Sequence, residues 1–268
     1  MRVLMLAPIR SGLYARVLAH LLAREPGIEL VGIVVRRPWS WGRIRGELRR
    51  DGPRLLKKVY QKLVLGDAAF KASPQRNLLT VAKESGLTAK TLQALATQAG
   101  CPCLTVGDHN DQKSLDFIRV QAPDAIAFTG GGLIRRDLLD IPKLGILNCH
   151  MGQLPPYRGM DVVEWPVLED TTGTPPLGLT VHTMDAGVDT GPILRVVKFG
   201  IEPGDDFARI RERLTARMPT LMFEVLRDLR DQRVVPEAQK AADGRQYYVL
   251  HPRLTAAAQS KLARQQSQ

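Results

Sequence analysis

Short apolar runs alternate with amphipathic stretches along most of the chain, and this alternation restricts the fold more than any other feature. Apolar runs of strand length cover residues 2–8, 29–35, 102–106, 124–129 and 144–149. Residues 12–23, with Ser11 as an expected N-cap, and residues 114–121 have apolar side chains at helical spacing. Strands that alternate with helices form parallel sheets through right-handed crossovers. We therefore expect an α/β fold in which helices cover both faces of a mostly parallel sheet.

The later part of the chain adds two strands and a long helix. Residues 179–184 and 193–197 predict strands on either side of a glycine-containing loop. From residue 207 to residue 229, apolar side chains recur at spacings of three and four, which predicts an amphipathic helix. Pro219 is expected to break this helix or to kink it into two parts, because proline removes a backbone hydrogen bond. The Ala- and Gln-rich end is expected to be helical or frayed.

The composition excludes several classes of protein. The 268 residues are 44% hydrophobic and 24% charged, which is typical of globular domains and not of disordered or collagen-like chains. No apolar run approaches the roughly 20 residues that span a membrane, and the first strand carries no signal-peptide pattern. Three cysteines, Cys101, Cys103 and Cys149, cannot form a disulfide framework. The cytoplasm is therefore the expected compartment.

The net charge of +11 is concentrated in one stretch. Residues 36–62 contain ten Lys and Arg residues against two acidic ones, with Trp39 and Trp41 near the start. We interpret residues 36 to about 100 as an insertion between the second and third strands. The basic part predicts contact with an anionic partner, either the phosphates of a substrate or an anionic membrane surface. A solvated surface and a nucleic-acid site are the alternatives.

Polar side chains gather at the end of the strand at 144–149. Asn148 and His150 are two residues apart, so they point to the same face of a strand, while Cys149 points into the core on the other face. Asp185 and Asp189 follow in a glycine-containing loop. An amide donor, an imidazole and a carboxylate in one pocket are typical of acyl transfer. From spacing alone, a hydrogen-bonded pair with no catalytic role is the more frequent alternative.

This segment resembles the formyltransferase family that uses 10-formyltetrahydrofolate. The family pattern Asn-x-His, followed by Leu-Pro-x-Tyr-Arg-Gly, is matched by Asn148, His150, Leu154, Pro155, Tyr157, Arg158 and Gly159. Its Gly-x-Thr-x-His and Asp-x-Gly-x-Asp-x-Gly elements are matched by Gly178, Thr180, His182, Asp185, Gly187, Asp189 and Gly191. The resemblance is strongest over residues 102–200. It implies a Rossmann-like catalytic domain over residues 1–235, followed by a short C-terminal extension over 236–268.

The resemblance also implies roles for individual residues. Asn148 and His150 would stabilise the oxyanion that forms when an amine attacks the formyl carbon, and Asp189 would keep His150 charged. The folate would be bound by the turn after residue 129 and by the loop after residue 183, that is by Gly131, Gly132, Leu133, Ile134, Leu139, Met184, Asp185, Gly187 and Val188. The amine acceptor, which can carry a phosphate, would contact Ser11, Gly12 and Arg158. No metal is implied.

Several residues lie outside these roles or depart from the family pattern. Gly152 and Gln153 stand where relatives usually carry Ser-Leu, which puts the acceptor in question. We expect helix-capping or solvent roles for His109 and Asn110, and structural roles for His20, His182 and His251. Cys101 and Cys103 give only weak support for a metal site, because no second pair accompanies them.

Three alternatives are weighed against formyl transfer to a small or sugar-nucleotide-like amine: hydrolysis of formyltetrahydrofolate, a methionyl-tRNA acceptor, and another nucleic-acid-binding role. Hydrolysis of formyltetrahydrofolate is disfavoured, because the family's hydrolase has a regulatory domain before the first strand and this chain starts its first strand at Arg2. A methionyl-tRNA acceptor, or another nucleic-acid-binding role, would suit the basic charge. The methionyl-tRNA enzyme, however, has a C-terminal β-barrel, whereas few residues follow Val234 here, and we therefore do not expect tRNA as the substrate. The sequence names neither the amine nor the oligomeric state.

Overall fold

The computed structural model describes residues 1–37 and 76–266 and contains one large sheet. Within these ranges, seven strands lie in the order β3-β2-β1-β4-β5-β7-β8. The strands β1 to β5 run parallel, whereas β7 and β8 are antiparallel to their neighbours. Their bounds are β1 Arg2–Ala7, β2 Glu29–Arg36, β3 Cys103–Val106, β4 Ala125–Phe128, β5 Ile146–His150, β7 Leu177–Thr183 and β8 Ile193–Phe199. The prediction of a mostly parallel α/β sheet is confirmed.

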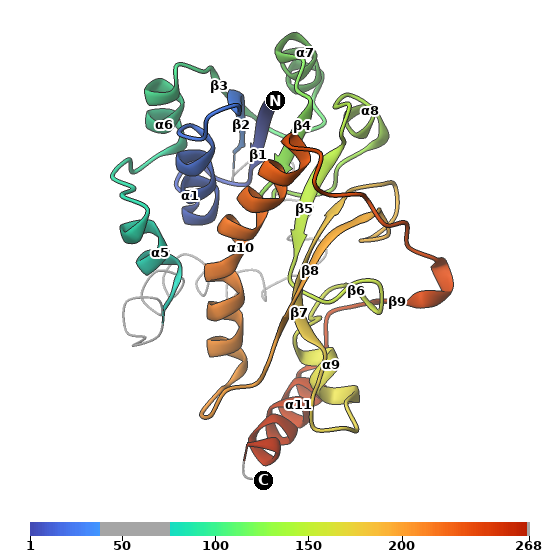
Figure 1. Cartoon of the computed structure of the whole chain (residues 1–268). Helices are drawn as coiled ribbons and strands as arrows, with labels where there is room; N and C mark the ends of the chain where they lie inside the picture. Colours follow the sequence, from blue (N-terminus) through green and yellow to red (C-terminus); the bar gives the residue numbers. More distant parts are fainter. Residues whose placement is uncertain (38–75, 267–268) are drawn as a thin grey trace.

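Helices cover the sheet on both faces (Figure 1). On one face, α1 (Leu13–Leu22), α6 (Leu92–Ala99) and α10 (Phe207–Arg230) pack over a core that includes Val3, Met5 and Ala7 of β1. On the other face, α7 (Gln112–Gln121) and α8 (Arg136–Leu139) cover Leu4 and Leu6 of the same strand. Alternate residues of β1 are therefore buried in two different cores, as a central parallel strand requires.

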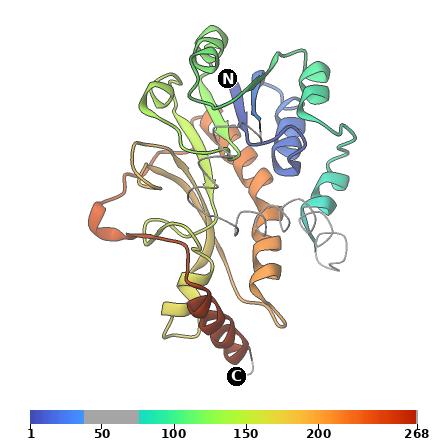
Figure 2. The same ribbon diagram turned by 180° about the vertical axis from the view of Figure 1, so that it is seen from behind.

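The C-terminal part extends the molecule beyond the sheet. In the two views of Figures 1 and 2, α11 (Pro252–Gln265) lies beside α9 (Glu164–Glu169), far from α1. A small parallel pair joins β6 (Tyr157–Gly159) to β9 (Arg245–Tyr247), so that a segment close to the C-terminus lies against the chain just after β5. A single 3-10 turn, Ala241–Asp243, precedes β9.

Two local predictions are wrong. The N-cap of α1 is Gly12 without any side-chain cap, so Ser11 does not cap the helix. Helix α10 runs unbroken through Pro219, which is buried among the apolar residues that face the sheet. Proline in a helix costs about 3 kcal/mol, and the burial of the long apolar face of α10 offsets this cost. The C-terminal helix predicted from Leu254 onward is present as α11.

The basic stretch 36–62 lies almost entirely outside the described residues. Later in the proposed insertion, α5 (Leu78–Glu84) and α6 pack beside α1, and Leu92 and Leu95 are fully buried. Among the described residues, none of the helices has the length and apolar character needed to cross a bilayer.

The strand order fixes where a ligand can bind. The chain leaves β1 toward β2 on one side, and β4 lies on the other side of β1, so the order reverses between β1 and β4. Open α/β sheets bind ligands at such a switch point, outside the carboxyl ends of the strands. The loop after β1 and the Gly130–Gly132 turn after β4 meet there, because a Cβ on Gly131 would lie 3.3 Å from the Cα of Pro8.

Candidate active site

The two polar residues of β5 share a face of the sheet, and the cysteine between them does not. Asn148 lies opposite His182 of β7, and His150 lies opposite Thr180. Cys149 is buried among the apolar residues under α1 and α10, where burial raises the pKa of its thiol to about 12. The prediction that Cys149 is a packed core thiol is confirmed.

Asp189 reaches these residues from the loop between β7 and β8. Its Oδ2 lies 3.4 Å from Nδ1 of His150 and accepts a hydrogen bond of 2.9 Å from the backbone N–H of Gly159. Its Oδ1 lies 3.4 Å from Nε2 of His182. The structure therefore brings Asn148, His150 and Asp189 together, and it adds His182, for which a purely structural role was expected.

His182 orients the amide of Asn148. The Nδ1–H of His182 donates to the carbonyl of Thr183 at 2.9 Å, which leaves Nε2 as an acceptor. The side-chain Nδ2–H of Asn148 donates to that Nε2 at 3.2 Å. The sequence held a signal for this contact, because His182 belongs to the Gly-x-Thr-x-His element. Only the antiparallel register of β5 and β7 reveals its partner.

Burial works against a positive charge on His150, whereas the family resemblance implied a charged ring. Burial lowers the pKa of His150 more than the nearby carboxylate of Asp189 raises it. The Nε2–H of His150 donates to the carbonyl of Tyr157 at 2.9 Å, and Nδ1 faces Oδ2 of Asp189 at 3.4 Å, so a proton on Nδ1 would lie between the ring and the carboxylate. A neutral imidazole can take up a proton during a reaction and return it.

Asp189 keeps its charge although it is largely buried. Burial alone would raise the pKa of Asp189, but its contacts with His182 and His150 and the N–H of Gly159 together hold it below its ordinary value. A carboxylate that stays ionised beside a neutral imidazole forms a unit that can accept a proton and stabilise the resulting imidazolium.

A small cavity of about 120 Å³ opens beside this cluster. Its lining contains His182 and Asp189, together with seven of the nine residues expected to bind folate: Gly132, Leu133, Ile134, Met184, Asp185, Gly187 and Val188. The other two lie elsewhere. Gly131 faces His109 and Pro8, and Leu139 packs against the core under α7 and α8.

Asp185 shapes the loop that carries Asp189. Its Oδ1 accepts hydrogen bonds from the backbone N–H of Gly187 at 3.0 Å and from the hydroxyl of Thr190 at 2.7 Å. A Cβ on Gly187 would lie 2.1 Å from Oγ1 of Thr190, so the turn has room only for glycine. The two aspartates of the loop thus have separate tasks: Asp185 closes the turn, and Asp189 faces the histidines.

The residues expected to bind the acceptor do not form one surface. Ser11 is exposed in the loop after β1, and Gly12 begins α1. The expectation for Arg158 is wrong. Arg158 is only 5% exposed, and its guanidinium donates to Oε1 of Gln239 at 3.2 Å and to the carbonyl of Lys240 at 3.0 Å. Arg158 therefore fixes the C-terminal segment and is not free to bind a substrate.

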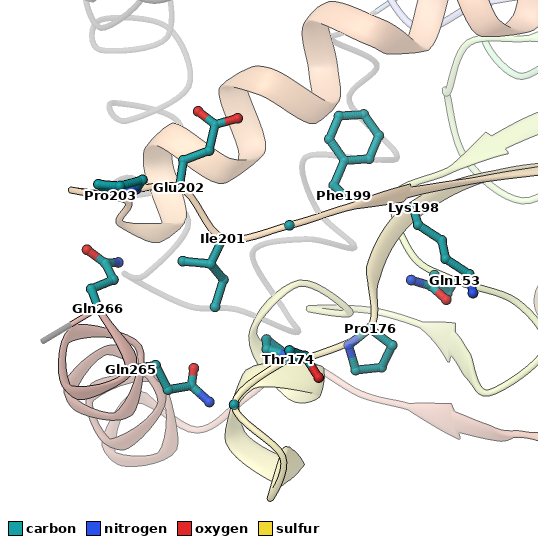
Figure 3. Close-up of a pocket in the computed structure, with 13 residues that line it drawn as sticks. Gln153, Thr174, Pro176, Lys198, Phe199, Ile201, Glu202, Pro203, Gln265 and Gln266 are labelled. Atoms are coloured by element: carbon teal, nitrogen blue, oxygen red, sulfur yellow. The ribbon is translucent and has the colours of Figure 1, made fainter. Parts of the chain in front are cut away.

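A larger cavity of about 630 Å³ lies away from the histidines, between α11 and the loops before β7 and α10. Figure 3 shows Lys198 and Gln153 at one end of it, and Gln265 of α11 with the following Gln266 at the other. None of the expected catalytic or folate-binding residues lines it. We place the chemistry at the smaller cavity, because the buried histidines and Asp189 adjoin that one. Within residues 1–37 and 76–266, no group of three or more His, Cys, Asp or Glu side chains has an arrangement that could hold a metal ion.

Known proteins resemble the chain over its central part. A sequence profile of the family described as "Formyl transferase" matches residues 72–226. The methionyl-tRNA formyltransferase of Trichlorobacter lovleyi is 33% identical over 149 residues, which are 55% of this chain and 46% of that protein. The same enzyme of Pelobacter propionicus is 35% identical over 47% of this chain and 39% of that protein. The matched region spans about half the length of these relatives.

Solved structures share the fold at low sequence identity. A glycinamide ribonucleotide transformylase from Symbiobacterium toebii has a TM-score of 0.57 at 18% identity, with 90% of this chain and 94% of that chain covered. A sugar N-formyltransferase from a Shewanella species has a TM-score of 0.56 at 12% identity, with 98% and 87% covered. The profile match extends over more than half of the chain, and this chain therefore belongs to the formyl transferase family.

Proposed function

We propose that this protein transfers a formyl group from 10-formyltetrahydrofolate to the amine of an acceptor molecule. The observation that carries the proposal is the position of Asn148, His150 and Asp189 around one point beside the small cavity. A carboxylate, an imidazole and an amide donor around a single point suit acyl transfer better than phosphoryl or hydride transfer.

The roles of the three residues follow from their contacts. 10-Formyltetrahydrofolate would supply an electrophilic formyl carbon. As the amine nitrogen bonds to that carbon, the carbonyl oxygen gains negative charge, and the second N–H of the Asn148 amide, the one not donated to His182, stabilises it. The amine proton passes to the pair formed by Asp189 and His150, which are 3.4 Å apart. When the bond from carbon to the folate nitrogen breaks, His150 returns a proton to that nitrogen, and the products are a formamide and tetrahydrofolate.

The folate would bind at the small cavity. With a volume of about 120 Å³ it has room for one end of the molecule only. Two apolar side chains flank it at the surface, Leu133, which is 75% exposed, and Val188, which is 40% exposed. Exposed apolar side chains on both sides of a polar cavity suit a flat aromatic ligand that carries hydrogen-bonding edges.

The test is direct. The protein is incubated with 10-formyltetrahydrofolate and a panel of primary amines that includes amino sugars linked to nucleotides, and the products are examined by mass spectrometry for the mass of one added formyl group. Tetrahydrofolate should also raise the melting temperature, because it binds only the folded chain. The proposal is wrong if tetrahydrofolate gives no shift and no amine of the panel is formylated while a known formyltransferase, run in parallel, is active.

One acceptor is favoured by a specific observation. The relatives from Trichlorobacter lovleyi and Pelobacter propionicus are methionyl-tRNA formyltransferases, and the net charge of +11 suits a polyanionic substrate. Methionyl-tRNA is therefore the second candidate acceptor. Formylation of methionyl-tRNA should fall steeply as salt is raised, whereas formylation of a small neutral amine should change little. Equal salt dependence of both reactions would count against tRNA.

A further inference from the structure

The loop that carries Asp189 is held from outside by the C-terminal segment. The side-chain Nε2 of Gln239 donates to the carbonyl of Asp189 at 3.0 Å and to the carbonyl of Gly191 at 2.6 Å. A backbone bridge between Ile193 and Glu237 brings the segment to this position. Gln239 lies beyond residue 226, where the family match ends, so nothing in that match gives it a role.

Arg158 fixes the orientation of the Gln239 side chain. The Nε–H of Arg158 donates to Oε1 of Gln239 at 3.2 Å, and an Nη2–H donates to the carbonyl of Lys240 at 3.0 Å. Because Oε1 accepts from arginine, the amide NH₂ of Gln239 must face the two carbonyls of the loop. The buried guanidinium thus connects the chain just after β5 to the loop through one glutamine.

The hydrogen bonds from Gln239 hold a part of the loop whose backbone conformation is unfavourable. Asp189 has a φ of +54°, in the left-handed region that residues other than glycine seldom adopt. Such a conformation costs about 1 kcal/mol or more and persists only where its surroundings hold it. Gln239 holds the carbonyl of Asp189 and that of Gly191, on either side of Thr190. The pairing of β6 with β9 holds Gly159, whose N–H binds the carboxylate of Asp189.

We propose that Gln239, held by Arg158, is a positioning residue for Asp189. On this proposal, the C-terminal segment helps to form the active site and is more than an extension of the catalytic domain. The effect on turnover rests on the proposed function. The effect on the geometry of the loop does not, because it follows from the hydrogen bonds themselves.

The decisive variant is Gln239→Glu. It keeps an oxygen for Arg158 but places a second carboxylate oxygen against the carbonyls of Asp189 and Gly191, where a donor is needed. The matched control is Gln246→Glu, the same change at an exposed side chain on β9. We expect kcat of Gln239→Glu to fall about 10- to 100-fold, as for a misplaced catalytic group, with little change in the KM for the folate donor.

The pH profile separates positioning from general stability. If the carboxylate of Asp189 moves away from His182 and from the N–H of Gly159, its pKa rises, and the acidic limb of the kcat profile of Gln239→Glu shifts to higher pH. Gln246→Glu should keep the wild-type profile. Gln239→Ala, which removes both contacts without adding charge, should show the same shift and serves if Gln239→Glu does not fold.

A readout without substrate completes the test. Amide hydrogen exchange over residues 184–192 should be faster in Gln239→Ala than in Gln246→Ala, while exchange in β1 and β4 stays unchanged. A folded Gln239→Ala with wild-type turnover, pH profile and loop exchange would overturn the proposal. If the wild-type chain transfers no formyl group at all, the proposed function fails, and the exchange measurement still decides whether Gln239 holds the loop.

Discussion

The contacts of single residues separate the two aspartates of the loop between β7 and β8. Asp189 faces His150 and His182, whereas both carboxylate oxygens of Asp185 accept from the hydroxyl of Thr190. The same residue type therefore serves two purposes within one short loop. The substitution of Asp by Asn tests this difference, because it removes the charge with little change in shape.

Asp189→Asn should lower kcat by about 100-fold or more, the usual effect of losing a general acid–base group. Asp185→Asn should retain most of the turnover, because an amide oxygen can still accept from Thr190. The measurement is the steady-state rate of both variants at saturating folate. Equal losses in the two variants would mean that Asp189, like Asp185, only shapes the loop.

Gly152, one of the departures from the family pattern, lies against His150, for which we propose a catalytic role. A Cβ at this position would be 2.8 Å from Nε2 of His150 and 2.8 Å from a methyl carbon of Val162. Both distances are shorter than real contacts allow, so either the ring or the backbone has to move. The departure at Gly152 therefore lies next to a proposed catalytic residue, and a substitution there tests the proposed chemistry.

Gly152→Ala should lower kcat about tenfold or more by displacing His150 from the carbonyl of Tyr157. Binding of tetrahydrofolate, followed by the melting temperature, should remain. Gly200→Ala is the control, since nothing lies within 4 Å of a Cβ there. If Gly152→Ala and Gly200→Ala have the same turnover, the loop accommodates the added methyl group without displacing His150.

Among the elements, the turn after β4 depends on the loop between β3 and α7. Three consecutive glycines, Gly130, Gly131 and Gly132, have φ values of +111°, +123° and +108°. Asn110 donates to the carbonyl of Leu133 at 2.8 Å and accepts from the N–H of Arg135 at 2.8 Å. Asn110 was expected to cap a helix or face solvent. Instead it holds a turn that lines the small cavity.

Asn110→Ala should therefore weaken folate binding and leave the chemistry intact. Loss of about 1 kcal/mol of hydrogen bonding corresponds to a rise of about fivefold in the KM for the donor, with kcat unchanged. Gln112→Ala, at an exposed position two residues later, should behave as the wild type. A fall in kcat without a change in KM would contradict this assignment.

At the scale of the whole molecule, local patterns predicted the sheet and the face of β5 that Asn148 and His150 share. Alternation placed β1, β2, β4 and β5, and a period of two placed Asn148 and His150 on one face with Cys149 on the other. These features depend on residues that are close together in the chain. They are therefore readable from the spacing of side chains.

Contacts between distant segments were not predictable in this way. The bond from Gln239 to Asp189 joins residues 50 positions apart, and the bond from Arg158 to Gln239 joins residues 81 apart. The unbroken helix at Pro219 depends on burial against the sheet, which outweighs local propensity. His109, expected at the surface, is 1% exposed because the Gly130–Gly132 turn covers it.

The burial of His109 links the stability of the whole fold to pH. Burial, with a smaller contribution from the charge of Arg36, lowers the pKa of His109 to about 4. In the unfolded chain a histidine takes up a proton near its ordinary pKa of about 6.5. Between these values the unfolded chain binds the extra proton and the folded chain does not. The stabilisation is therefore complete above the unfolded pKa and is lost as the pH falls toward the folded one.

The expected contribution is about 3 kcal/mol of unfolding free energy between neutral pH and the folded pKa of His109. Glutamine keeps a polar side chain but cannot titrate. Over this pH range, the unfolding free energy of His109→Gln should therefore fall by about 3 kcal/mol less than that of the wild type. Unfolding in urea at neutral pH and at steps down to about pH 4 measures both slopes. His20→Gln is the comparison variant, because burial also lowers the pKa of His20. Parallel slopes for the wild type and His109→Gln would mean that His109 becomes protonated in the folded protein at its ordinary pKa, and that the turn after β4 opens to water more readily than its packing implies.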